Sequence, residues 1–328
     1  HAVSFADRKY RQDKLRVMHR HTGISSLVFV CTLMLSACDS SQPPEFSITG
    51  VTSNTVQYPA HVIQVGSRFV AAELLDNRLS VSATAEFSSP VFIDKSVLGT
   101  VLSSPHFLEA ANDGGVLVSE GWGKGIVKVD DRVKGNFERY TGPPGDGMHA
   151  PHGVCQAKDG WIYVADSLNS RLVRFRDMSG KEWEVFKDHQ RLIAYGRQLL
   201  CRDDGIWLAN SYENREGLNP GQGSNILHIT DFASGQVDVI VSFPDTNTTG
   251  LAVIDDRWLV AGLWSGKNRL LMVDLDGRHE HTYLKRPDGV AGPPYGISVD
   301  TNKRKMYVCH IGDIYKKSSA GGVVVYDY

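Results

Sequence analysis

A self-similar unit recurs six times along the chain, and this repetition limits the folds that are open to it. Each unit has a short apolar strand, a turn rich in Asp, Gly or Asn, and a second strand of alternating apolar residues. A third strand follows, such as RLVRF at 171–175. One anchor position recurs 43 to 54 residues apart, at His61, His106, His152, Tyr195, Thr249 and Tyr295. That spacing is the length of one four-stranded blade, so the repeats predict an all-β, six-bladed β-propeller.

The order of the strands also predicts how the ring closes. A fourth, outer strand follows each of the first five units but is missing after the sixth, where the chain ends on GGVVVYDY at 321–328. The missing pattern occurs instead near the start, in PEFSITGV at 44–51. We therefore expect this N-terminal segment to pair with the C-terminal one, which leaves only short, protected strand edges.

The first 37 residues have the pattern of a secretion signal and are excluded from the fold. Ile24 to Leu35 is mostly apolar but too short to span a bilayer, and LSAC follows at 35–38. This arrangement resembles the lipobox of bacterial lipoproteins. The resemblance implies that Cys38 is lipidated and anchors the protein in the cell envelope, on the periplasmic side of the inner or outer membrane.

The domain prediction follows from this signal. It comprises a lipoprotein-type signal segment at 1–37, a polar tether at 38–44 and a propeller at 45–328. Because Met18 would begin a signal of ordinary length, we expect 1–17 to be upstream read-through or a fragment edge. A cleaved soluble signal and a buried strand are the alternatives for the apolar run.

The net charge gives no reason to expect a nucleic-acid partner. The formal net charge is −2, and the part after residue 37 holds 29 basic against 35 acidic residues, a net charge of −6. Such a chain lacks the excess of basic residues that nucleic acid or an anionic membrane surface attracts. We expect a monomer that touches the membrane only through its lipid anchor.

Three cysteines remain outside the signal and the lipobox: Cys155, Cys201 and Cys309. An odd number gives no complete disulfide framework, and the spacings match no zinc ribbon. We expect buried thiols, and a single Cys155–Cys201 bridge between neighbouring blades is the alternative.

The third repeat resembles the NHL family of propellers. Residues 151–175 (PHGVCQAKDGWIYVADSLNSRLVRF) contain the P-x-G-V, D-G-x-I-Y-V-A-D and S-x-N-x-R elements, and 294–300 keep P-Y-G-I-S-V-D. The resemblance spans 56–328, although the other repeats keep only the hydrophobic skeleton. It favours a structural turn network for Asp166, Asn169 and Arg171.

Two sets of aligned positions are predicted to face the mouth of the axial channel. The first is the anchor set named above. The second, at the ends of the second strands, comprises Glu73, Glu120, Asp166, Asn210, Gly262 and His310. Packing alone rarely gathers imidazoles, carboxylates and phenols, so this mouth is the candidate site.

The P-H openings of the second and third blades, and P-A-H in the first, resemble the propeller of peptidylglycine amidating lyase. That resemblance implies that His61, His106 and His152 hold a divalent metal ion, with zinc favoured and calcium as the alternative. In that family the ligands come from blades spread around the ring, whereas these come from three consecutive blades. The other interpretation is that these histidines fill space or bond backbone carbonyls.

Two functions remain open on the sequence. The first is a metal-assisted lyase or hydrolase, with Glu73 or Glu120 as the base and Tyr195 or Tyr295 as a proton donor or substrate contact. His310 is a further candidate catalytic residue. The second is a non-catalytic scaffold that binds a ligand or a partner protein.

Insertions predict where a ligand would be recognised. They lie at 210–225, at 285–294 and after His310, on the face of the predicted site. Tyr212, Arg215 and Tyr315 are the residues in them that we expect to contact a small-molecule, peptide or sugar ligand. The alternative is that these residues only cap the propeller.

Overall fold

The computed structural model describes residues 43–52, 55–100, 102–130, 136–212, 224–244, 246–264, 269–277, 281–284, 287–317, 319 and 321–328. The chain separates into His1–Gln42 and Pro43–Tyr328, and only the second unit contains described residues. The predicted signal segment, Cys38 and Arg215 therefore lie outside them. No helix of the described part is long and apolar enough to cross a membrane.

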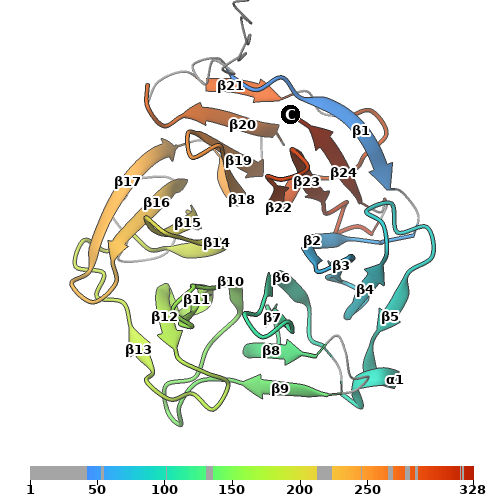
Figure 1. The fold of residues 1–328 in the computed structure, drawn as a ribbon. Coiled ribbons are helices and arrows are strands. Elements are labelled where there is room, and N and C mark those ends of the chain that lie inside the picture. The colour runs from blue at the N-terminus through green and yellow to red at the C-terminus, as the bar shows by residue number, and fades with distance from the viewer. Residues whose placement is uncertain are drawn as a thin grey trace, which may run out of the picture. The chain divides into compact units, whose positions relative to one another are not determined.

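Six four-stranded antiparallel sheets surround a common axis, as predicted (Figure 1). The first five blades, each from the inner to the outer strand, are β2 (Pro59–Val65), β3 (Arg68–Glu73), β4 (Arg78–Ser82) and β5 (Val91–Ile93); β6 (Pro105–Ala110), β7 (Val116–Glu120), β8 (Gly125–Val129) and β9 (Phe137–Tyr140); β10 (Pro151–Gln156), β11 (Ile162–Asp166), β12 (Arg171–Phe175) and β13 (Glu184–Val185); β14 (Tyr195–Arg202), β15 (Gly205–Ser211), β16 (Ser224–Asp231) and β17 (Gln236–Phe243); β18 (Asn247–Ile254), β19 (Trp258–Trp264), β20 (Arg269–Asp274) and β21 (His281–Leu284). Short helical turns are α1 (Lys95–Leu98) and a 3-10 turn at Ser167–Asn169.

The sixth blade closes the ring with strands from both ends of the described unit. It contains β22 (Pro294–Asp300), β23 (Lys305–His310), β24 (Gly322–Asp327) and, as its outer strand, β1 (Ser47–Thr52). Ile48 pairs with Tyr326 and Val51 with Val324, antiparallel. The predicted closure is confirmed.

Alternation of side chains within each strand builds the core between neighbouring blades. Ile63 and Val70 of the first blade pack with Leu108 and Val118 of the second in one buried cluster. Some of the turns that connect inner and second strands use glycine where the backbone has a positive φ. Gly160, at φ 95°, is an example.

A disulfide joins the inner strands of two neighbouring blades. Cys155 on β10 is bonded to Cys201 on β14, with 5.6 Å between their Cα atoms. The favoured prediction of free thiols is therefore wrong for this pair, and the alternative is right, because the strands of adjacent blades approach closely at this level. Cys309 is free and buried.

Each inner strand changes register as it passes the mouth, and this irregularity sets which side chains are equivalent. In the second blade Pro105 pairs with Glu120, but Leu108 pairs with Val118, so the strand contains a β-bulge. Shifts at the same place occur in the other five blades. In each blade, the residue that directly follows the last paired residue before the shift occupies the equivalent position. These residues are Ala60, His106, His152, Arg197, Thr249 and Tyr295.

This register corrects both predicted rings. Ala60 replaces His61 and Arg197 replaces Tyr195 in the first ring, and Leu263, which pairs with Thr248, replaces Gly262 in the second. The prediction treated Tyr195 as equivalent to His152. Strand pairing instead makes Gly196 equivalent to Pro151, because each is the last paired residue before the shift.

Candidate functional site

Arg197 lies among aromatic side chains from three blades. Its guanidinium carbon is 4.4 Å from the centroid of the Tyr195 ring, 5.9 Å from that of Tyr295 and 6.0 Å from that of Trp264. Its Nη1 donates a hydrogen bond of 3.1 Å to the Tyr295 hydroxyl. Because β14, β19 and β22 belong to the fourth, fifth and sixth blades, the cation bridges half of the ring.

Two imidazoles complete this group from the other side. The His106 and His152 rings have centroids 4.2 Å apart, and His106 lies 6.0 Å from the Tyr295 ring. The Tyr195 hydroxyl is 3.3 Å from Nε2 of His152. We name His106, His152, Tyr195, Arg197 and Tyr295 the axial cluster.

Backbone carbonyls fix the tautomer of both histidines in the axial cluster. Nδ1 of His106 lies 2.6 Å from the carbonyl oxygen of Ser104, and Nδ1 of His152 lies 2.9 Å from that of Ala150. Since a carbonyl only accepts, each Nδ1 carries the proton and each Nε2 carries a lone pair. Nε2 of His152 accepts from Tyr195, whereas that of His106 has no hydrogen-bond partner among the described residues.

The axial cluster is positively charged through Arg197 alone. Burial lowers the pKa of His106 to about 3, and the charge of Arg197 adds to this effect. The pKa of His152 is also lowered, first by burial and then by electrostatic interaction with His106 and Arg197. Burial raises the pKa of Tyr295 to about 12. Neutral imidazoles and a neutral phenol thus surround one guanidinium at physiological pH.

Acid should destabilise the fold through these histidines. The pKa of His106 is lowered in the folded state, so its stabilising effect is complete above the unfolded value near 6.5 and is lost as pH falls toward 3. Urea unfolding at pH 7.0 and 5.5 should show a smaller pH-dependent loss of stability in His106→Asn than in the wild type. The exposed His189→Asn is the matched control. An identical loss in the His106 variant and the wild type would contradict this prediction.

His61 is separated from the axial cluster by its own hydrogen bonds. Its Nε2 lies 3.3 Å from the carbonyl oxygen of Ile297, and its Nδ1 accepts from the backbone N–H of Leu108 at 3.1 Å. Gln198 also bonds Ile297, donating to its carbonyl at 2.6 Å and accepting from its N–H at 3.0 Å. These side chains connect the inner strands by bonds to the backbone.

The residues that the structure gathers do not fit the predicted zinc site. His61 has its single lone pair occupied by Leu108, and the Arg197 cation disfavours a second positive charge beside His106 and His152. Within the described ranges, no group of three or more His, Cys, Asp or Glu residues has an arrangement that could hold a metal ion.

The predicted bases Glu73 and Glu120 are fully buried and already paired. Glu73 accepts from Nε and Nη2 of Arg78 at 3.0 and 2.9 Å, and from the backbone N–H of Gln57 at 2.8 Å. Glu120 accepts from Arg139 at 2.9 and 3.0 Å and from the N–H of Ser103 at 2.9 Å. Each carboxylate therefore fixes the loop that leads into its own inner strand.

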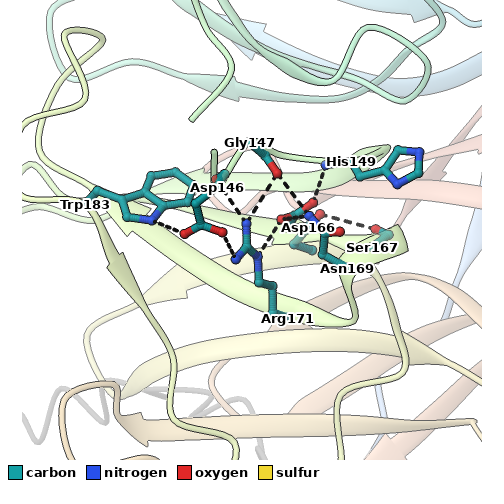
Figure 2. Close-up of polar contacts among 9 residues, drawn as sticks. Asp146, Gly147, His149, Asp166, Ser167, Asn169, Arg171 and Trp183 are labelled. Atoms are coloured by element: carbon teal, nitrogen blue, oxygen red, sulfur yellow. Dashed lines mark hydrogen bonds and ion pairs between the residues drawn. The ribbon is translucent and has the colours of Figure 1, made fainter. Parts of the chain in front are cut away.

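Asp166 performs the same task in the third blade, as the NHL resemblance implies (Figure 2). It accepts from the N–H of His149 at 2.6 Å, from Asn169 at 2.8 Å and from Arg171 at 2.7 Å. Arg171 also bonds Asp146. In the fourth blade, Asn210 accepts from the N–H of Ala194 at 2.9 Å. Glu73 and Glu120, which the sequence suggested as bases, thus hold the loops of their own blades as Asp166 holds that of the third blade.

Glu73→Gln should cost stability. Removing the charge from a fully buried partner of Arg78 is expected to lower the free energy of unfolding by about 2–4 kcal/mol. Urea unfolding measures this, with the exposed Glu86→Gln as the matched control. A variant as stable as the control would argue against the structural role.

Aromatic side chains also lie on the loops at the mouth. Tyr315, on the loop after His310, is 82% exposed and lies 6.3 Å from the Trp264 ring. Trp122, between β7 and β8, is 71% exposed. Tyr212 is half-buried, and Nδ1 of His310 lies 3.2 Å from the Gly292 carbonyl.

Arg197 and Trp264 are the site residues that the sequence comparison missed. Arg197 follows Tyr195 by two positions, and a comparison that allowed a one-residue shift per blade would have aligned it with His106 and His152. Trp264 ends a second strand, one residue beyond the position that strand pairing makes equivalent to Glu120.

Comparisons with known proteins support the fold. No family model matches the chain, and no curated protein is similar to it in sequence. Among solved structures, virginiamycin B lyase from Staphylococcus aureus, in a catalytically inactive form with Quinupristin, has a TM-score of 0.57 at 16% identity, over 87% of this chain and 100% of that one. The gluconolactonase XC5397 from Xanthomonas campestris has 0.60 at 13%, over 83% and 86%. The PQQ-bound aldose sugar dehydrogenase from Streptomyces coelicolor has 0.62 at 11%, over 87% and 99%. The chain is thus a six-bladed β-propeller similar in fold to a lyase, a lactonase and a dehydrogenase.

Proposed function

We propose that the axial cluster is the active site of a lyase or hydrolase that acts on a small organic molecule bearing a carboxylate or a polarised carbonyl. The observation that carries this proposal is Arg197, a cation held among neutral imidazoles and phenols contributed by several blades. A guanidinium in this position would hold a carboxylate or stabilise a developing oxyanion.

The histidines and tyrosines would handle protons around that anion. Nε2 of His106, which has no hydrogen-bond partner in the described part of the chain, would be a proton acceptor. A bound anion would offset the charge of Arg197 and raise the pKa of this imidazole toward neutral pH. Tyr295, whose pKa is raised to about 12, keeps its proton and can donate it to a leaving group or an oxyanion. Glu73 and Glu120 do not take part, because arginines already hold them.

A panel of probes tests this function. We would screen the protein by thermal shift and by loss of substrate with benzoate, glucono-δ-lactone and quinupristin, the last two suggested by the neighbours in fold. The proposal predicts binding or turnover that His106→Asn reduces. Turnover that is unchanged in this variant would overturn the assignment of His106. Equal ligand-induced thermal shifts in the wild type and in Arg197→Met would overturn the assignment of the site to the axial cluster.

A non-catalytic binding module is the second candidate. The exposed Trp122 and Tyr315 would give a partner two large contact points on the mouth loops. Saturable binding of a panel member without any chemical change would favour this function.

We also propose that the protein is anchored in the envelope through Cys38. The Cys155–Cys201 disulfide supports an oxidising compartment, since such bonds persist mainly outside the cytosol. Incorporation of labelled palmitate that persists in Cys38→Ser would contradict this anchor.

A further inference from the structure

A depression lies at the end of the axis opposite the mouth, where three inner strands end. Its volume is about 410 Å³, and its walls come from β2, β6, β22 and β23 of three successive blades. It includes Gln64, Glu109, Ser298 and Asp300 at the far ends of inner strands. A hollow of this size falls within the range of small-molecule sites.

Glu109 faces this depression without a partner. No hydrogen bond or ion pair joins its carboxyl group to a described residue, which sets it apart from Glu73 and Glu120. Glu109 is half-buried on β6, and this burial raises the pKa of its carboxyl group to about 8, with no cation among the described residues to offset the effect. A carboxyl group in the wall of a hollow that has no counter-charge is a candidate contact for a cationic ligand.

The surrounding groups are acceptors or are already neutralised. The Oγ atom of Ser298 is buried and has no hydrogen-bond partner in the described structure. Asp300 pairs with Lys303 at 3.0 Å, and the same lysine donates to Gln64 at 2.9 Å. No lysine or arginine is among the described residues that line the hollow. Among these residues, Glu109 is therefore the one carboxyl group that lacks a counter-charge.

We propose that this far-end depression binds a small organic cation bearing a primary ammonium group, with Glu109 as its counter-charge and Ser298 as a hydrogen-bond acceptor. An ammonium group has three donors and a compact charge, which suit a carboxylate and a hydroxyl in the wall of the same hollow. The Gln198 and His61 bonds to Ile297 connect the inner strands between the two ends, so this site is distinct from the axial cluster.

Putrescine is the probe that tests the proposal. Isothermal titration of the full chain at pH 7.5 and low salt should show saturable binding, at least tenfold weaker in Glu109→Gln. The exposed Glu138→Gln in the same blade should bind as the wild type does. Arg197→Met should also bind putrescine normally, which separates this site from the mouth and from the proposed function.

Two outcomes would overturn the proposal. One is the absence of saturable putrescine binding at millimolar concentration, and the other is equal binding by the wild type and Glu109→Gln. Thermal melting checks that the variant folds. Should Glu109→Gln fail to fold, Ser298→Val, which removes the acceptor and narrows the same hollow, should weaken binding instead; unchanged binding in that variant would equally refute it.

Discussion

Reduction of the Cys155–Cys201 disulfide is expected to lower the free energy of unfolding by about 2–4 kcal/mol. The bond closes a loop over 46 positions of sequence, and a cross-link across a loop of this length restricts the unfolded chain strongly. It also ties β10 to β14, the strands that carry His152 and Arg197. We therefore expect reduction to weaken ligand binding at the mouth as well.

Urea unfolding with and without dithiothreitol measures the loss. The double variant Cys155→Ala/Cys201→Ala should be destabilised and should not respond to the reductant. Cys309→Ala removes the free thiol, and the response of this variant to dithiothreitol should match that of the wild type. A wild type whose unfolding is insensitive to the reductant would show that the bond does not stabilise the fold.

Arg197→Met should weaken binding of a carboxylate probe at the mouth by roughly 10- to 150-fold, the value of a charge-assisted hydrogen bond. Methionine keeps most of the side-chain volume among Tyr195, Trp264 and Tyr295 but removes the charge and the bond to the Tyr295 hydroxyl. Arg197→Lys keeps the charge without the planar group, so an intermediate loss is expected.

The exposed Arg269→Met is the matched control, since Arg269 lies on β20 of a neighbouring blade and contacts Tyr283. Affinity for the carboxylate probe that falls equally in this control would point to a general loss of surface charge instead.

Removing the Arg197 charge should also change the proton affinity of the neighbouring histidines. In Arg197→Met, the pKa values of His106 and His152 should rise, which NMR titration of the imidazoles can follow.

The fold could be predicted from the sequence because the repeated units must pack against one another to bury their apolar faces. A repeat that cannot bury its apolar face alone must stack against its neighbours, and the missing outer strand of the sixth blade left one segment, 44–51, to complete the ring. Turn chemistry and alternating apolar residues then placed the strands without knowledge of side-chain contacts.

The site was predicted less well because a bulge moves side chains by one residue without a clear sequence signal. His106, His152 and Tyr295 lie at equivalent positions of their inner strands, whereas strand pairing brings Arg197 into this ring and takes His61 out of it. The pairing of Glu120 with Arg139 joins β7 to β9, and no local motif announces such a contact. Only the packed blades show which carboxylates are already neutralised.

A crystal structure of the protein with the strongest-binding member of the carboxylate and lactone panel tests the central claim most directly. The ligand's anionic or carbonyl oxygen is predicted to lie within hydrogen-bonding distance of the Arg197 guanidinium, with Nε2 of His106 facing the ligand. A ligand bound away from Arg197, or a metal ion held jointly by His61, His106 and His152, would contradict it.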